Sequence, residues 1–456
     1  MLPAFVALSI ACTRGHPSDA SDSTSAWTPP DDGLILASDL RGNEWFTAEP
    51  TTGAIVDELW LNTLEPDVCV DETTDHYCLL FQSRDHISEA DPANPVDEIV
   101  FTYADMNLSD GTDDGRDDLI SRVYSVDRQT HATRWHFQNL DFSHISNSGD
   151  YCTWDPADPC QADSSVDDHG FWACSLHMAH DAVITDETAT SVGMWVVDSR
   201  NSRMLHVELD RSSTCAVVDT VIDNHIPDWD IYDSVNSMNR WTDGDNDNLL
   251  MSVKGSFPDA QTGQHQFGES SAGKIIQWRR DMVANGGTDP WRQVWEFPPM
   301  STTEESFLSD PHGSNRFTGA DGHNYVVFAH SLGHSDGTTY GDGTGGSIGL
   351  LRVDDDVPVY MYDALLPKPD ALQFPRDVTP LADGSMLVTD SGCLGDGCQY
   401  ETYDWIVHLP EADPAVGVSG AWRADHSQQV FRSVDVLHGP LFKPANLLFS
   451  SEWIAR

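Results

Sequence analysis

The sequence IPDWDIYDSVNSM at residues 226–238, followed by WTDGDNDN and LLMSVKG up to residue 255, opens the most informative stretch of this chain. After a polar insertion it continues with GKIIQWRRD at 273–281 and RQVWEFPP at 292–299. These runs are rich in Val, Ile, Trp and Phe and are bounded by Gly, Asp, Asn or Pro, which is typical of successive antiparallel strands. A unit of about 40–50 residues built only from strands predicts one blade of a β-propeller.

Similar units recur along the chain. They begin near residues 33, 76, 171, 226, 310 and 374. We therefore expect an all-β fold, a six-bladed β-propeller formed by residues 33–456 as one domain, with seven blades as the alternative. The segment PWRQVWEF at 290–297 is expected to be a strand rather than a helix, because aromatic and β-branched residues favour strands. The segment QVFRSVDVL at 429–437 is expected to close the ring against the first unit.

The charge of the chain is strongly negative. Its 456 residues include 24 Lys and Arg against 74 Asp and Glu, a formal net charge of −50. Such a surface repels phosphate backbones, so no nucleic-acid partner is expected. The charge suits a salty medium, a set of Ca²⁺ sites, or both. No run of 18 or more apolar residues occurs, so no transmembrane helix is expected.

The N-terminus indicates export. Residues 1–12, MLPAFVALSIAC, resemble the end of a bacterial lipoprotein signal in which Cys12 carries the lipid. Residues 13–32 are rich in Ser, Thr, Asp and Pro and predict a flexible tether. We expect a cell-surface or periplasmic lipoprotein, or a secreted protein, that touches a membrane only through a lipid on Cys12.

The cysteines also indicate export. Nine are present, and setting Cys12 aside leaves eight, an even number. Their spacing predicts four disulfides in an oxidising compartment, and no CxxC knuckle suggests zinc. The expected pairs each close a short loop or one blade: Cys69–Cys78, Cys152–Cys160, Cys174–Cys215 and Cys393–Cys398.

Candidate ligand-binding residues recur where each unit enters its first strand. In a propeller these strands line the central channel. Three of four such segments, LHMAHDAVIT, SDPHGSNRF and QFPRDVTP, place His or Arg beside Asp or Gly. The residues concerned are His177, His180, His312 and Arg376. A ring of His and Arg can bind a sulfate or carboxylate, and His can also transfer protons or act as a nucleophile. Alternatively, these histidines cap turns and satisfy backbone groups.

The order HMAHDAVIT, DWDIYDSVNSM, LLMSVKG, GKIIQWRRD, VWEF, DPHG and YVVFAHS, between about residues 171 and 410, resembles the arylsulfotransferase family. The resemblance implies an exported bacterial six-bladed propeller that transfers a sulfuryl group between phenols through a sulfated histidine, with no nucleotide cofactor. The chain departs from the family motif at Ser234, where a His is usual, and at Arg376, where a catalytic His is expected.

On this resemblance His180 and His312 are expected to be catalytic, with Arg376 clamping the sulfate. His177, Asn236 and His330 are expected to bind the substrate, an aryl sulfate, a phenol or another anionic ligand. The alternative function is that of a non-catalytic cell-surface binding or scaffold propeller, for which Ca²⁺ is a candidate stabilising ion.

Two acidic loops have the spacing of a structural Ca²⁺ site. Alternate oxygen ligands on a tight turn suit a hard cation of this size, although neither loop has the Glu at position 12 of an EF-hand. The alternative is chance spacing in an acidic chain. The candidate ligands are Asp110, Thr112, Asp114 and Asp118 in the first loop, and Asp243, Asp245 and Asp247 in the second.

Overall fold

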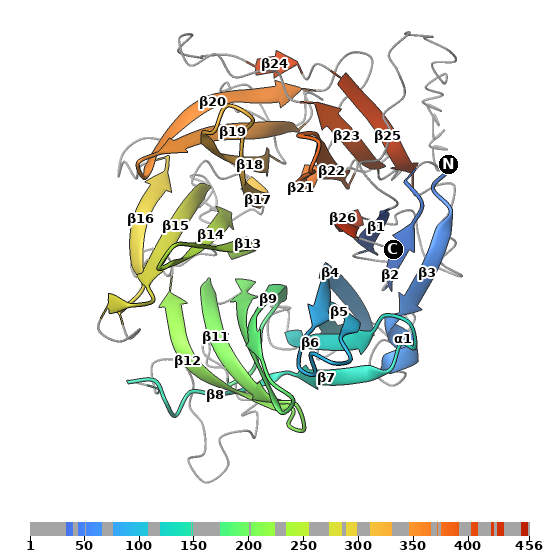
Figure 1. Ribbon diagram of the computed structural model, residues 1–456. Coiled ribbons are helices and arrows are strands. Elements are labelled where there is room, and N and C mark those ends of the chain that lie inside the picture. Colours follow the sequence, from blue (N-terminus) through green and yellow to red (C-terminus); the bar gives the residue numbers. More distant parts are fainter. Residues whose placement is uncertain are drawn as a thin grey trace, which may run out of the picture.

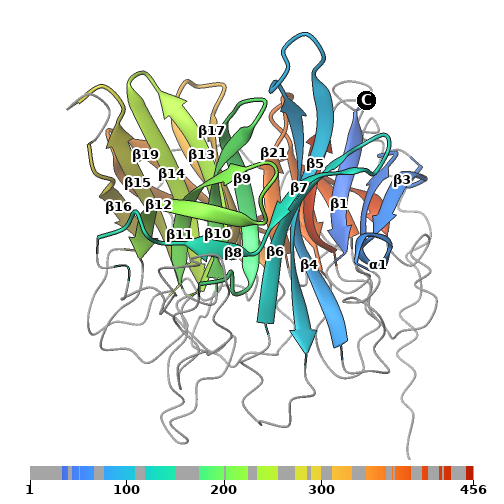
Figure 2. The same ribbon diagram turned by 90° about the horizontal axis from the view of Figure 1, so that it is seen from below.

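The computed structural model describes an all-β protein whose sheets stand around a central axis, the arrangement of a β-propeller (Figure 1). Figure 2 shows that the strands run from one face of the ring to the other. The described residues are 33–39, 44–50, 52–65, 76–107, 119–146, 148, 174–199, 202–223, 234–254, 273–284, 289–298, 311–330, 346–365, 372, 375–391, 403–408, 421–423, 426–432 and 448–454.

These residues form six sheets of four or five strands. Within each, consecutive strands pair antiparallel and the first named below lies nearest the axis (Figure 1). The first sheet is β26 (Leu448–Ile454), β1 (Leu34–Asp39), β2 (Glu44–Ala48) and β3 (Ile55–Trp60), followed by the short helix α1 (Leu61–Leu64). The second is β4 (His76–Ser88), β5 (Val96–Asn107), β6 (Leu119–Asp127) and β7 (Thr133–Phe137).

The next two sheets follow the same order. The third is β9 (Ala179–Glu187), β10 (Ser191–Asp198), β11 (Arg203–Asp210) and β12 (Cys215–Asp223), with β8 (Asn139–Asp141) added parallel to β12. The fourth is β13 (Ser234–Asp243), β14 (Asn246–Lys254), β15 (Lys274–Asp281) and β16 (Arg292–Phe297). The predicted strand in PWRQVWEF is therefore confirmed as β16.

The last two sheets complete the ring. The fifth is β17 (Pro311–Thr318), β18 (Asn324–His330), β19 (Ser347–Asp354) and β20 (Val357–Leu365), with β24 (Ala421–Arg423) parallel to β20. The sixth is β21 (Pro375–Pro380), β22 (Met386–Asp390), β23 (Tyr403–His408) and β25 (His426–Arg432).

Apolar side chains fill the space between neighbouring sheets. Trp195 and Val197 of β10 pack with Val235 of β13 and Met251 of β14 in one buried cluster. Because alternate residues of a strand face opposite sides, a strand with a sheet on each side is apolar on both faces. This accounts for the continuous apolar runs such as GMWVV in β10, which is buried throughout its length after Ser191.

The strand that closes the ring differs from the prediction. Residues 426–432, which contain the expected QVFR, form β25 at the outer edge of the sixth sheet, paired with β23. The first sheet is closed instead by β26, whose Trp453 lies opposite Ile35. A Cβ at Gly33 would lie 2.3 Å from the Trp453 indole, so only glycine fits beside the closing strand.

The disulfide prediction is open to a direct test. Cys78, Cys174 and Cys215 are disulfide-bonded, and the other six cysteines lie outside the described residues, as do residues 1–32 with the export segment and tether. Peptide mapping without reduction is expected to recover the pairs Cys69–Cys78, Cys152–Cys160, Cys174–Cys215 and Cys393–Cys398. A free thiol or a cross-linked peptide joining other cysteines would contradict this pairing.

No helix in the described part of the chain is long and apolar enough to span a membrane.

Candidate functional site in the channel

Each of the six inner strands contributes one side chain to a connected cluster on the axis. We call this set the channel cluster. Its members are Phe81 of β4, His180 of β9, Asn236 of β13, His312 of β17, Arg376 of β21 and Phe449 of β26. The cluster therefore exists only when the whole ring has closed.

The inner strands are bulged where they supply these side chains. The pairing of β13 with β14 skips Asn236, and that of β21 with β22 skips Arg376. In the same way, the pairing of β9 with β10 skips His180 and that of β26 with β1 skips Phe449. Phe81 lies within a bulge of β4. His312 immediately precedes the bulge in β17. A bulge leaves its extra residue out of the ladder and redirects its side chain, so it can place a polar group on the axis.

A chain of polar contacts links four members. The Nδ1 of His180 lies 3.2 Å from the Asn236 carbonyl oxygen. The Nδ2 of Asn236 lies 3.3 Å from His312 Nε2, and Arg376 Nη1 donates to the same Nε2 at 2.7 Å. His180, Asn236 and His312 are all buried. The structure thus brings together the three residues predicted to be catalytic, and Asn236 joins them.

These contacts define the tautomers of both histidines. A carbonyl oxygen can only accept, so His180 Nδ1 carries the proton and its Nε2 has the lone pair in the neutral ring. A guanidinium can only donate, so His312 Nε2 accepts from Arg376 and its proton is on Nδ1. A neutral imidazole with a lone pair on Nε2 can act as a nucleophile or base.

Two phenylalanines surround the polar members. Phe81 stacks on His180 with ring centroids 4.3 Å apart, and Phe449 meets the same ring edge-on at 5.2 Å. Phe449 also lies 6.4 Å from the His312 ring and 5.7 Å from the Arg376 guanidinium carbon. Aromatic faces fix the imidazole planes and exclude water from the polar contacts. Sequence analysis missed both residues.

The other two predicted substrate-binding residues lie off the inner strands. His177 precedes β9, where its backbone N–H donates to Asp198 Oδ1 at 3.0 Å. His330 is the last residue of β18, the second strand of the fifth sheet, and is fully buried. The expected role of His177 and His330 in substrate binding stays a prediction.

A second polar layer follows one or more residues further along the same strands. Arg84 of β4 donates from Nε and Nη2 to the two carboxylate oxygens of Asp181 of β9, both at 2.7 Å. Asp181 is fully buried and also accepts from the Met238 backbone N–H at 3.0 Å. This layer borders a cavity of ≈ 140 Å³ whose lining includes Asp377 and Glu452. The sequence feature that could have indicated this layer is the aspartate directly after His180 and after Arg376, namely Asp181 and Asp377.

Burial of two carboxyl groups in the sixth sheet, Asp404 of β23 and Asp377 of β21, changes their titration. It raises the pKa of Asp404 to about 7 and that of Asp377 to about 6. An aspartate in an unfolded chain titrates near pKa ~3.9. Between about pH 4 and pH 7 the native protein therefore holds protons that the unfolded chain has released. The free energy of unfolding is expected to fall as pH rises through this window.

Thermal unfolding at several pH values tests this expectation. The wild type should melt at a higher temperature near pH 5 than near pH 8. The Asp404→Asn variant keeps an acceptor for the Ser451 hydroxyl, which bonds to Asp404 at 2.7 Å, and should flatten the slope. Asp210→Asn is the control, because this exposed carboxylate has a lowered pKa and titrates below the window. A wild-type melting temperature that rises from pH 5 to pH 8 would contradict the prediction.

The three candidate ligands of the second acidic loop lie in different surroundings. Residues 243–246 make a tight hairpin between β13 and β14, with Gly244 at φ +58°. Asp243 and Asp245 are exposed, whereas Asp247 is buried and paired with Arg240 at 2.9 Å and Arg280 at 3.4 Å. The same spacing also suits a Gly-containing hairpin turn, and the cation site stays a prediction. No group of three or more possible metal ligands occurs in the described ranges. The first loop, from Asp110 to Asp118, lies outside them.

Comparisons with known proteins do not identify a family for this chain. No family model matches the chain, and no curated protein matches it. A protein of unknown function from Bacteroides caccae is similar in structure at 9% identity, with a TM-score of 0.43, over 93% of this chain and 100% of its own. The periplasmic gluconolactonase of Pseudomonas aeruginosa is similar in structure at 8% identity, with a TM-score of 0.41, over 93% of this chain and 99% of its own. Neither is named as a sulfotransferase.

Proposed function

We propose that this protein is an arylsulfotransferase-like β-propeller with six blades, one for each sheet, that transfers sulfuryl groups between phenolic compounds. The observation that supports this function is the channel cluster, in which His180, His312 and Arg376 are linked through Asn236. A transferred sulfuryl group carries negative charge on its oxygens, which a guanidinium stabilises by paired hydrogen bonds.

The tautomers assign the roles. In the first step the Nε2 lone pair of His180 attacks sulfur, the bond from sulfur to the aryl oxygen breaks, and the phenolate leaves with the electron pair. In the second step an acceptor phenol attacks sulfur, the N–S bond returns its electrons to Nε2, and the phenol proton passes to the released phenolate. Arg376 holds the sulfuryl oxygens, and His312 positions Arg376 through its Nε2.

A binding propeller without turnover is the second candidate. Phe449 packs near His180, His312 and Arg376 at once, which favours a small ligand over an aryl ring beside these residues. In that case the cluster holds a small anion and releases it unchanged. In both cases we propose an exported protein, lipidated on Cys12 or secreted, with a structural Ca²⁺ in the loop at 110–118 and no nucleic-acid partner.

One assay separates these functions. The protein is incubated with 4-nitrophenyl sulfate as donor and phenol as acceptor, without nucleotide. Release of 4-nitrophenolate is followed by absorbance and phenyl sulfate is detected by mass spectrometry. Phenyl sulfate formed in proportion to enzyme supports the transferase. Saturable binding of the aryl sulfate without any product supports the binding propeller.

A further inference from the structure

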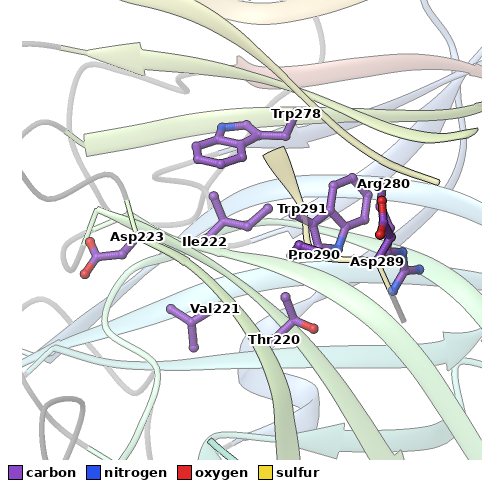
Figure 3. A pocket seen from close by; sticks show the side chains of 9 residues that line it. All are labelled: Thr220, Val221, Ile222, Asp223, Trp278, Arg280, Asp289, Pro290 and Trp291. Atoms are coloured by element: carbon purple, nitrogen blue, oxygen red, sulfur yellow. The ribbon is translucent and has the colours of Figure 1, made fainter. Parts of the chain in front are cut away.

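A larger pocket lies away from the channel, between the third and fourth sheets (Figure 3). Its volume is ≈ 430 Å³, within the range of about 300–1,000 Å³ that is usual for ligand sites. One wall is the end of β12, from Thr220 to Asp223, and the other is Trp278 and Arg280 of β15 with the segment 289–291 before β16. None of the channel cluster lines it.

Two indoles give this pocket its apolar surface. Trp278 and Trp291 lie around Ile222, as Figure 3 shows. Trp291 is held in place, because its ring meets Trp195 edge-on at 5.2 Å and the Arg280 guanidinium carbon lies 5.1 Å from its centroid. A rigid aromatic surface of this kind presents contact area to a ligand at little cost in side-chain entropy.

Polar groups stand at the two ends of the same pocket. Asp223 lies at one end and Arg280 with Asp289 at the other (Figure 3). Arg280 also donates to the buried Asp247 at 3.4 Å, so part of its charge is already balanced. The chain as a whole has a formal net charge of −50, which disfavours an anionic ligand.

The indole N–H groups are a further observation. The Nε1 atoms of Trp278 and Trp291 are both buried without a hydrogen-bond partner among the described residues. A buried donor without an acceptor costs free energy, and such groups are few in native proteins. A ligand hydroxyl oxygen is an acceptor of the kind that these donors lack.

We propose that this pocket binds a neutral saccharide. A pyranose or furanose ring has an apolar face of C–H groups and a rim of hydroxyls that both donate and accept. The apolar face matches the indoles, and the hydroxyls match the carboxylates, the guanidinium and the Thr220 hydroxyl. A simple phenol would cover the indoles but would offer a single hydroxyl to polar groups that lie at both ends of the pocket. This proposal does not depend on the function of the channel.

The test is direct binding to the whole protein. D-Glucose, D-galactose, D-mannose, D-xylose, L-arabinose and cellobiose are each titrated to about 10 mM, which would saturate a site with a Kd of ~1 mM. Tryptophan fluorescence and isothermal titration calorimetry are the readouts. At least one sugar should bind saturably, and Trp278→Leu, which keeps apolar volume in the core, should weaken binding by about tenfold.

Further variants keep the test decisive. Asp289→Asn with Asp223→Asn changes no core contact and should weaken the same sugar, even if Trp278→Leu fails to fold. Trp241→Leu is the matched control, because this partly buried tryptophan lies under Arg316 outside the pocket. The Trp241→Leu variant should bind the sugar with the affinity of wild type. The proposal fails if no sugar binds saturably, if binding survives the aspartate changes unaltered, or if phenol displaces the sugar from the pocket.

Discussion

Replacing His180 with alanine is expected to lower the rate of sulfuryl transfer by at least about 10³-fold, because in the proposed mechanism this residue supplies the attacking lone pair. Its Nδ1–H contact with the Asn236 carbonyl leaves Nε2 as the nucleophile. Arg376→Met should cost about 10²–10³-fold in kcat, as expected for loss of a group that stabilises charge in the transition state. The His312→Ala variant should resemble Arg376→Met, since His312 acts through Arg376.

The control for this series is His206→Ala. His206 pairs with Asp219 at 2.9 Å on β11, away from the inner strands, and its loss should leave transfer unchanged. Each variant is compared with wild type by the 4-nitrophenyl sulfate assay and by its melting temperature. A folded His180→Ala protein with wild-type activity would exclude His180 as the nucleophile. Intact mass of the protein after donor addition should also show a sulfuryl adduct in wild type and none in His180→Ala.

The largest expected effect on stability comes from breaking the ion pair between Arg84 and Asp181. Arg84→Ala would leave the fully buried Asp181 carboxylate without its guanidinium, near the carboxyl of Asp377. Removing one partner of a buried pair typically costs about 3–5 kcal/mol. Because Arg84 itself is 24% exposed, we expect the lower end, about 3 kcal/mol. Urea unfolding followed by tryptophan fluorescence measures the change.

Two variants make the result interpretable. Arg84→Gln with Asp181→Asn replaces the charges by an amide pair and should recover most of the loss, since no unpaired charge remains buried. Asp356→Asn removes an exposed carboxylate that Arg279 holds at 2.6 Å, and should change stability by no more than about 1 kcal/mol. If Arg84→Ala unfolds at the same urea concentration as wild type, the pair does not stabilise the closed ring.

Local sequence was sufficient for the strands and for the class of fold. The runs SVGMWVVD and KIIQWRRD form β10 and β15, because β-branched and aromatic residues in short segments bounded by turn residues favour strands in almost any context. The same reasoning identified His180, His312 and Arg376, since each begins an inner strand with a similar arrangement of neighbours. The local sequence could not show which side chains lie at the same height when the inner strands come together around the axis.

Other features depended on contacts between distant segments. Both 426–432 and 448–454 have the composition of a strand, and only pairing with β1 makes the second the closing strand. The spacing from Asp243 to Asp247 suits a cation loop, whereas the tight turn at Gly244 and the ion pair of Asp247 with Arg240 depend on strand pairing and side-chain packing.

An all-β chain of repeated strand units, with three of the polar residues near its axis, could be predicted from the sequence, because these features follow from local propensity and from repetition. The packing of Phe81 and Phe449 around His180 and the pairing of Arg84 with Asp181 could be seen only in the folded chain. The reason is physical. Phe449 and His180 come together only when the ring closes, and the bulges that turn these side chains inward arise from strand register, which no single segment contains.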